Sequence, residues 1–460
     1  MSNQVGTESS KRAALIIAAT SSFVVPYMAS AVNIAMPAIG AEFGMDAVLL
    51  SWVATAYLLV TGVTLLPMGK LADIHGRKLI FTIGMVVYII GALLAGLASS
   101  PYQLIIFLAV QGAGSGMIFS TSIAILTSIY PPEERGKVLG IAVAAVYIGL
   151  SIGPFLGGVL TEHLGWRSIF LIGVPLGLII IALVFAFLKG EWAEAKGEKF
   201  DIFGSIILGF ALVSLIYGLS ELPSVIGIWL TPTGLILLAA FIAWERRVGN
   251  PVMNVSLLTK NHVFAFSNLA ALIHYSATFG VTYLLSLYLQ YIKSMTPQQA
   301  GAVLVVQPVL MALFSPFAGR LSDKIEPRIV ASAGMALTVL GLVPLVFLDG
   351  SSSVAYVIGC LVLLGIGFAF FSSPNTNAIM GSVEKKYYGV ASAMVGTMRV
   401  IGQMLSMATA IMLFSLIIGR VQIVEDNFPE FLISIRTAFT VFSVLCFAGI
   451  FASLARGKMR

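Results

Sequence analysis

The sequence has very little charge for its length. Asp, Glu, Lys and Arg together make up 10% of the 460 residues, whereas 58% of the residues are hydrophobic. Ordinary soluble domains carry about 25% charged residues. The scarcity of charge excludes an ordinary soluble protein, and it predicts a chain whose main solvent is lipid.

Cysteine and recognisable catalytic motifs are also scarce. The two cysteines, Cys360 and Cys446, both lie inside long apolar runs, which excludes a disulfide framework and a Cys/His metal site. The sequence contains no phosphate-binding P-loop and no HExxH motif. The net charge of +6 is spread over short clusters rather than one patch. We therefore expect no enzyme activity, no cofactor, no metal and no nucleic-acid partner.

What the sequence does contain is a series of long apolar runs. About 20 apolar residues are needed to cross a bilayer as a helix. Fourteen runs reach or approach this length, and they predict an all-α integral membrane protein. The predicted spans are 13–36, 48–68, 79–98, 102–128, 139–160, 168–188, 203–220, 225–244, 263–289, 298–318, 329–348, 353–379, 388–418 and 432–455.

Lys and Arg are concentrated on one side of these predicted spans. Of the 26 basic residues, all but Arg167, Lys293, Arg399, Arg420 and Arg436 fall in the terminal segments and loops on that side. Basic loops remain in the cytoplasm. The pattern predicts a multi-pass protein of the cell membrane with both termini in the cytoplasm.

Two loops on the basic side repeat one pattern. Residues 69–78 read GKLADIHGRK and residues 319–328 read GRLSDKIEPR, each with one carboxylate, Asp73 or Asp323, among several cations. Repeats of six spans build the two halves of many transporters. We predict an N-terminal half over 1–189, a linker with two extra spans over 190–260, and a C-terminal half over 261–460.

With this repeat and three further motifs, the chain resembles the major facilitator superfamily, in particular its fourteen-span drug/proton antiporter branch. The motifs are 69–78, GLSIGPFLGG at 149–158, FDIFG at 200–204, and WERR at 244–247 followed by Pro251. The resemblance covers nearly the whole chain. It implies a major facilitator fold and export of small amphipathic compounds by alternating access.

The two repeat loops and the span 5 motif supply the predicted gating residues. Asp73 beside Arg77 is suited to a conformational latch, although a solvated basic loop is the alternative. The span 5 glycines and Pro154 favour close helix packing, with or without a role in coupling. The full set is Gly69, Asp73, Gly76, Arg77, Gly149, Gly153, Pro154, Gly157 and Asp323.

No carboxylate falls at the centre of a predicted span. The resembled branch usually carries an Asp in span 1 and an Arg in span 4, where this chain has Met28 and Leu108. Both departures remove groups tied to proton handling. Only His274 and Arg399 are ionisable groups near the bilayer middle, where a cation usually has a function or a specific partner. A neutral core imidazole and a bond to helix carbonyls are the structural alternatives.

By resemblance, spans 1, 4, 9 and 12 line a central cavity. The expected cavity residues combine neutral polar groups, aromatic rings and the two ionisable groups. They are Asn33, Trp52, Tyr57, Gln111, His274, Tyr275, Gln307, Phe371, Asn375, Asn377, Arg399 and Gln403, with Tyr147 as a further aromatic candidate.

Three functions remain open at this point. The first is a multidrug-type exporter of small amphipathic compounds, with or without proton coupling. The second is an exporter of lipid-like, neutral or anionic molecules without ordinary proton antiport, and the third is a membrane sensor in a transporter-like shell. The expected partners are the substrate, protons where transport is coupled, and membrane lipids, and a monomer is expected.

Overall fold

The computed structural model describes residues 8–253, 255–384 and 388–457, and every regular element among them is a helix. Fourteen helical segments are long and apolar enough to cross a membrane, as predicted. The first seven helices are α1 (Glu8–Phe43), α2 (Ala47–His75), α3 (Arg77–Gly96), α4 (Pro101–Ile129), α5 (Pro132–Leu164), α6 (Ser168–Leu171) and α7 (Gly173–Phe187). The next two are α8 (Ile202–Glu221) and α9 (Val225–Glu245).

The second half begins after the short helix α10 (Val255–Lys260). It contains α11 (His262–Leu287), which continues as the π-helical turn η1 (Tyr288–Ile292), α12 (Pro297–Leu304), α13 (Val306–Ser322), α14 (Pro327–Leu345), α15 (Val354–Gly381), α16 (Tyr388–Ile417), the 3-10 turn η3 (Glu425–Asn427) and α17 (Phe428–Ala455). In the structure, the sixth, ninth, tenth and fourteenth spans each combine two of these elements.

Polar residues at the helix starts explain where many spans begin. The side chains of Asp46, Ser100, Ser224 and Ser353 each accept a hydrogen bond from a backbone N–H in the first turn of the helix that follows. Such caps satisfy N–H groups that have no partner within the helix. Inside lipid, all remaining backbone groups must bond within the helix, which is why apolar runs of this length become helices.

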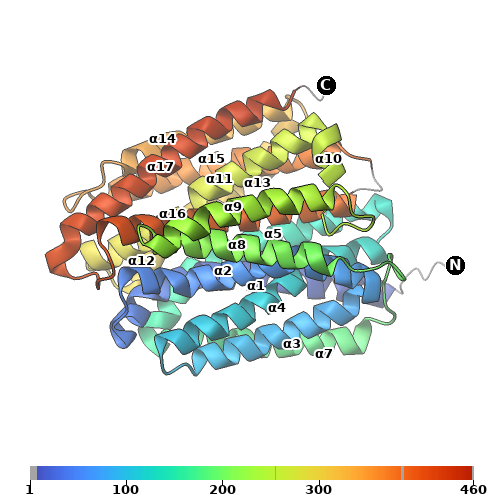
Figure 1. The fold of residues 1–460 in the computed structure, drawn as a ribbon, viewed down its shortest axis with the longest axis horizontal. Coiled ribbons are helices and arrows are strands. Elements are labelled where there is room, and N and C mark those ends of the chain that lie inside the picture. The colour runs from blue at the N-terminus through green and yellow to red at the C-terminus, as the bar shows by residue number, and fades with distance from the viewer. Residues whose placement is uncertain (1–7, 254, 385–387, 458–460) are drawn as a thin grey trace.

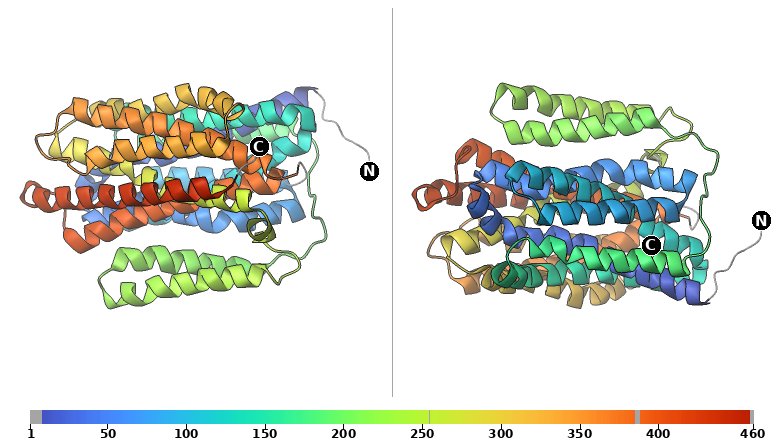
Figure 2. Two further views of the ribbon diagram at one scale, coloured as in Figure 1. Left: turned by 90° about the horizontal axis from the view of Figure 1, so that it is seen from above. Right: turned by 90° about the horizontal axis from the view of Figure 1, so that it is seen from below.

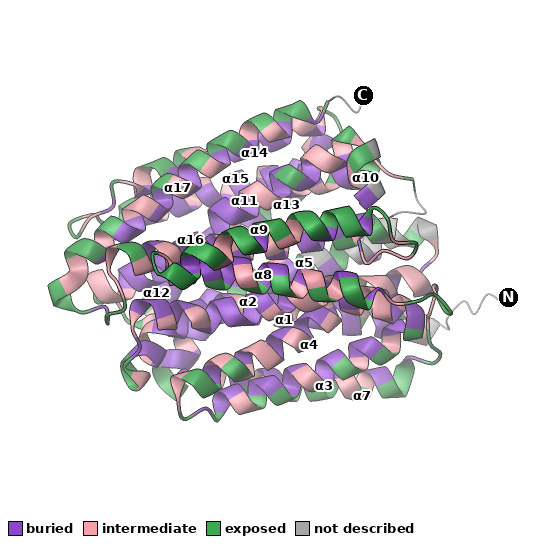
Figure 3. Cartoon of the chain, viewed as in Figure 1, coloured by how far each residue is buried: buried purple, intermediate pink, exposed green. Residues whose placement is uncertain are grey.

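The helices form two bundles with one pair beside them (Figures 1 and 2). Within the first bundle α1 packs against α5, and α4 packs against α2 and α3; within the second, α11 packs against α16, and α15 packs against α13 and α14. The helices α8 and α9 pack on each other and reach the bundles through α2 and α16. Most of α9 is exposed (Figure 3), as expected for a helix that faces lipid.

Both described chain ends lie at the same end of the molecule (Figure 1). We call this the basic end, because the Lys- and Arg-rich loops lie there, and we call the other the opposite end. An even number of spans requires this arrangement.

Candidate functional site

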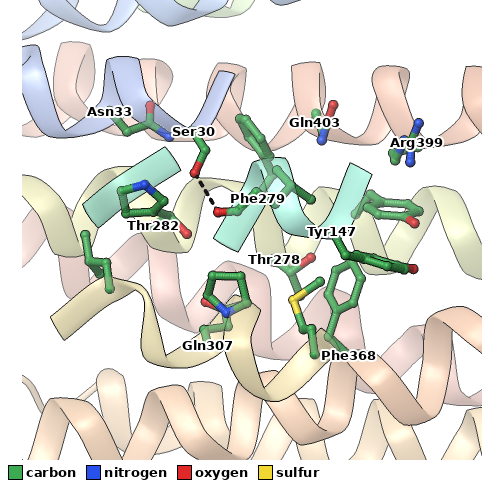
Figure 4. Close-up of a pocket in the computed structure, with 16 residues that line it drawn as sticks. Ser30, Asn33, Tyr147, Thr278, Phe279, Thr282, Gln307, Phe368, Arg399 and Gln403 are labelled. Carbon is green, nitrogen blue, oxygen red and sulfur yellow. Dashed lines mark hydrogen bonds between the residues drawn. The ribbon is translucent and has the colours of Figure 1, made fainter. Parts of the chain in front are cut away.

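A small pocket lies at the centre of the molecule, between the two bundles (Figure 4). Its lining comes from α1, α5, α11, α12, α13, α15 and α16. The pocket volume is about 70 Å³. Sites for drug-sized ligands measure about 300–1,000 Å³, so the bundles must move apart before a molecule of that size can bind here.

The lining of this central pocket is aromatic and amide-rich with one cation. Amide side chains come from Asn33, Gln307 and Gln403, and the only charged side chain among the described lining residues is Arg399. The other described lining residues are Ser30, Tyr147, Leu150, Pro154, Tyr275, Thr278, Phe279, Thr282, Leu304, Pro308, Met311 and Phe368. No carboxylate belongs to this described set, so the pocket has no counter-charge for a cationic ligand.

Towards the opposite end, hydrogen bonds close the two bundles against each other. Ser286 Oγ donates to the carbonyl of Asn33 at 2.8 Å, and the Ser51 and Tyr283 hydroxyls lie 2.7 Å apart. A Cβ on Gly301 of α12 would lie 2.3 Å from the carbonyl oxygen of Pro154 in α5. These contacts hold the two bundles together on this side of the central pocket.

A wider cavity opens on the basic end. Its volume is about 390 Å³, and it is lined by α2, α4, α16 and the loop 249–253. Phe119 belongs to this cavity, and the guanidinium of Arg399 lies 4.6 Å from the centre of its ring. The Tyr147 and Ser372 hydroxyls also meet at 2.7 Å across the two bundles. Because Arg399 lines the central pocket and Phe119 lines the wider cavity, their contact lies between the two.

Six of the predicted cavity candidates line the central pocket: Asn33, Tyr275, Gln307, Arg399, Gln403 and the further aromatic candidate Tyr147. Span 4 lines the wider cavity at the basic end and does not reach the central pocket, to which spans 5, 10 and 13 contribute. Glycines explain the difference: a Cβ on Gly112 would lie 2.4 Å from the carbonyl oxygen of Tyr57. Helix α4 is therefore fixed between its neighbours α2 and α3.

The other predicted N-terminal cavity residues face neighbouring helices. Gln111 is fully buried beside Gly91 of α3. Tyr57 accepts a hydrogen bond from Ser115 at 2.7 Å within the first bundle. The ring of Trp52 lies 5.9 Å from that of Tyr217 in α8. These three side chains stabilise packing and do not line the central pocket.

His274 is enclosed in the second bundle rather than in the central pocket. It is fully buried, its ring stacks on Phe371 at 4.1 Å between ring centres, and Phe368 contacts it edge-on. Its Nε2 lies 3.3 Å from the hydroxyl of Thr338. This environment is that of a core imidazole. Phe371, another predicted cavity residue, packs against His274 inside the bundle and does not line the central pocket.

Asn375 and Asn377 hold the basic end of the second bundle together. Asn375 Oδ1 accepts a hydrogen bond from Arg456 at 2.9 Å, and Asn377 donates to Ser322 at 2.8 Å. Arg456 is only 1% exposed, and burial lowers the pKa of its guanidinium to about 10. The group therefore remains charged at neutral pH and depends on these polar partners.

The predicted latch residues form an ion-pair network at the basic end. Arg77 pairs with Asp73 at 2.8 Å and with Glu194 of the linker at 2.8 Å. Lys70 pairs with Glu198 at 2.6 Å. The linker thus binds the first repeat loop directly, which local sequence could not indicate.

The remaining gating candidates differ from one another. Gly76 has a φ of 131°, a conformation suited to glycine, and it joins α2 to α3. Gly69 lines the cavity at the basic end. Asp323 is exposed at the end of α13. The carboxylates of the two repeat loops therefore differ in exposure, since Asp73 is only partly exposed.

The span 5 motif has two faces. Gly149, Gly153 and Gly157 pack against α1, since a Cβ on Gly149 would lie 2.4 Å from the carbonyl oxygen of Phe23. Pro154 faces the other way and lines the central pocket. Tight packing within one bundle explains the glycines, and contact between the bundles explains Pro154.

Several lining residues escaped the sequence reasoning, notably Ser30, Thr278 and Thr282. Ser30 donates to the Leu150 carbonyl at 3.2 Å, which joins α1 to α5 at the pocket wall (Figure 4). Thr278 and Thr282 lie one turn apart on α11, following Tyr275. Thr278 lies three residues after Tyr275 and Thr282 four residues after Thr278, a helical spacing that places the three on one face.

The sequence profile of the Major Facilitator Superfamily matches residues 18–267 and 267–458. The riboflavin transporter RibZ of Clostridioides difficile is 30% identical to this chain, over 95% of both proteins. The multidrug resistance protein Stp of Mycobacterium tuberculosis is 30% identical over 82% of this chain and 71% of its own length. The cephamycin export protein CmcT of Amycolatopsis lactamdurans is also 30% identical, over 85% and 82%.

Solved structures show the same fold. A bacterial homologue of the human lysosomal transporter Spinster, in an inward-facing and unoccupied conformation, matches with a TM-score of 0.71 and 15% identity over 98% of both chains. The nucleoside transporter NupG matches with a TM-score of 0.63 and 14% identity, over 97% of this chain and 99% of its own. The chain therefore belongs to the major facilitator superfamily and is a membrane transporter, not an enzyme.

Proposed function

We propose that this transporter exports small amphipathic molecules across the cell membrane by alternating access. The halves 1–189 and 261–460 move against each other, and 190–260 adds a linker and the pair α8–α9. The basic end faces the cytoplasm, as the distribution of Lys and Arg favours. The supporting observation is a pocket between the halves that is closed towards one end, beside a cavity at the other. Relatives named as export and multidrug resistance proteins support the direction.

The substrates we propose are neutral or anionic. A cation moved into a desolvated pocket needs a counter-charge, whereas the charged group of this lining is Arg399. Tyr147, Tyr275 and Phe368 offer aromatic surface, and the three amide side chains offer hydrogen bonds. This lining suits a planar molecule with polar edges, and a relative named as a riboflavin transporter supports that class.

The test is uptake into proteoliposomes that contain the purified protein. We expect transport of riboflavin and of an anionic amphipathic dye at rates at least about tenfold above that of a permanent quaternary ammonium dye, a difference of about 1.4 kcal/mol. Each substrate is measured with and without a pH gradient. Preferred transport of the quaternary ammonium dye would contradict the proposed charge selection.

We propose Asp73 as a latch residue. Asp73→Asn removes the ion pair with Arg77 but leaves the pair between Arg77 and Glu194. The expected result is a several-fold loss of transport with unchanged substrate binding, because the substitution favours one conformation without altering the pocket. Transport and thermal stability are measured together, with Asp323→Asn as the matched substitution in the second repeat loop. Parallel loss of stability and transport in Asp73→Asn would indicate a structural role only.

A further inference from the structure

Two buried carboxyl groups meet at the basic end of the α8–α9 pair, outside the central pocket. Asp201 caps the start of α8, and Glu245 is the last residue of α9. Their exposed fractions are 7% and 3%. Asp201 Oδ2 and Glu245 Oε1 lie 2.4 and 2.6 Å from the position of a Cβ on Gly204. The two oxygens therefore flank the same point, and a side chain at residue 204 would displace them.

The hydrogen bonds of the two groups are unequal. Asp201 accepts from the Gly204 N–H through Oδ1 and from Trp244 Nε1 through Oδ2, both at 2.9 Å. Glu245 Oε2 accepts from the Met253 N–H at 2.8 Å, but Glu245 Oε1 is buried without a hydrogen-bond partner. Asp201 therefore has a donor at each of its two oxygens, whereas Glu245 has a donor at only one. A proton on Glu245 Oε1 would give this unpartnered oxygen a hydrogen bond to donate.

No ion pair neutralises this carboxyl pair in the described part of the chain. The nearest cations along the sequence are exposed: Lys196, Lys199, Arg246 and Arg247. On α2, which packs against α8, Lys70 pairs with Glu198 and Asp73 pairs with Arg77. On α16, Arg399 lies over Phe119. Two adjacent buried carboxylates without a cation repel each other strongly, and one proton between them removes that cost.

We propose that Asp201 and Glu245 bind one proton between them, carried on Glu245 Oε1 and donated to Asp201 Oδ2. Release of this proton to water at the basic end would leave two carboxylates side by side. Glu245 also holds the backbone of Met253, and the loop 249–253 lines the cavity at the basic end. Proton occupancy therefore controls the position of one wall of that cavity. This inference does not depend on which substrate is carried or on whether transport uses a proton gradient.

Infrared difference spectroscopy of the full-length protein in lipid nanodiscs tests the bound proton. A carboxylic acid absorbs separately from a carboxylate, so a pH titration reports protonated carboxyl groups. Glu245→Gln resembles the protonated side chain and keeps an acceptor for Met253, so the fold is expected to persist. In the parent we expect one acid band that persists to a higher pH than the bands of the exposed carboxyl groups. This band should be lost in Glu245→Gln and retained in Glu221→Gln. An unchanged band in Glu245→Gln would overturn the proposal.

Asp201→Asn gives a second spectroscopic test. Removal of the neighbouring negative charge lets Glu245 ionise more easily. The Glu245 acid band should therefore titrate at a pH lower by about one unit or more. A titration at the parent's pH would contradict the shared proton.

Cysteine labelling tests the effect on the cavity wall. The two native cysteines are buried, so a cysteine introduced at Asn250 in the loop can be followed with a water-soluble maleimide. We expect its labelling rate, corrected for the reactivity of a free thiol at each pH, to rise severalfold with pH in the parent background. The rate should be independent of pH with Glu245→Gln. The same pH dependence in both backgrounds would overturn control of the wall by this proton.

Discussion

Gly301→Ala is expected to shift the transporter towards a conformation open at the opposite end and to abolish most transport. The added Cβ would lie 2.3 Å from the carbonyl oxygen of Pro154. Both atoms belong to helices, α12 and α5, so neither can turn away as a flexible side chain could. The described conformation, in which the opposite end is closed, cannot form without moving these helices apart.

The size of the effect follows from the cost of overpacking. Inserting a methyl group into a closed contact costs about 1–3 kcal/mol, which changes the ratio of two conformations about 5- to 150-fold. The added methyl group does not destabilise a conformation in which α5 and α12 are separated. The substitution should therefore leave the amount and the thermal stability of the protein nearly unchanged, since alanine is also the better helix former.

Labelling in intact cells distinguishes this conformational shift from misfolding. A cysteine at Thr282, which lines the central pocket, should react with a membrane-impermeant maleimide added outside only in the Gly301→Ala background. Gly359→Ala is the matched control, because a Cβ at that helical glycine meets no atom within 4 Å. Unchanged labelling of this cysteine and unchanged transport in Gly301→Ala would contradict the role of this contact. If Gly301→Ala increased labelling only for maleimide added on the cytoplasmic side, the opposite end would face the cytoplasm, and the proposed orientation would be reversed.

The sequence predicts the number of helices and the depth of residues along them far better than the direction of each side chain. The predicted span 225–244 differs by one residue from α9, Val225–Glu245, because length and apolar composition are what a bilayer selects. Depth was also sufficient to select Arg399 and Gln403, which both line the pocket. Helices that are apolar on all sides carry little information about which face meets which neighbour.

The direction of the side chain separates the candidates that line the central pocket from those that do not. His274 and Tyr275 are adjacent in α11, yet Tyr275 lines the pocket and His274 faces Phe371 inside the bundle. Met28, at a position where the resembled branch carries an Asp, is 2% exposed in the apolar core. Contacts between distant segments, such as that of Glu194 with Arg77, have no local signal at all. These features depend on packing between helices that periodicity cannot reveal.

Arg399 is expected to decide which charge the pocket accepts. Among the described residues that line the central pocket, Arg399 has the only charged side chain. Its guanidinium contacts the ring of Phe119 in the other half. Two unit charges about 4 Å apart interact by about 1 kcal/mol in water and about 4 kcal/mol near a protein surface. Arg399→Gln should therefore slow transport of an anionic amphipathic dye by about tenfold or more, while a neutral substrate such as riboflavin is affected much less.

Reversal of the charge provides the sharpest form of this prediction. Arg399→Glu places a carboxylate where the described pocket lining has none, so uptake of a quaternary ammonium dye should rise as uptake of the anionic dye falls. Arg399→Lys retains the charge and should retain the parent's order of substrates. Phe119→Leu removes the ring under the guanidinium, worth about 0.5–2 kcal/mol, and should change rates without changing that order. Equal losses for neutral and anionic substrates in Arg399→Gln would instead assign Arg399 to the contact between the halves, because a purely structural cation cannot distinguish the charge of a substrate.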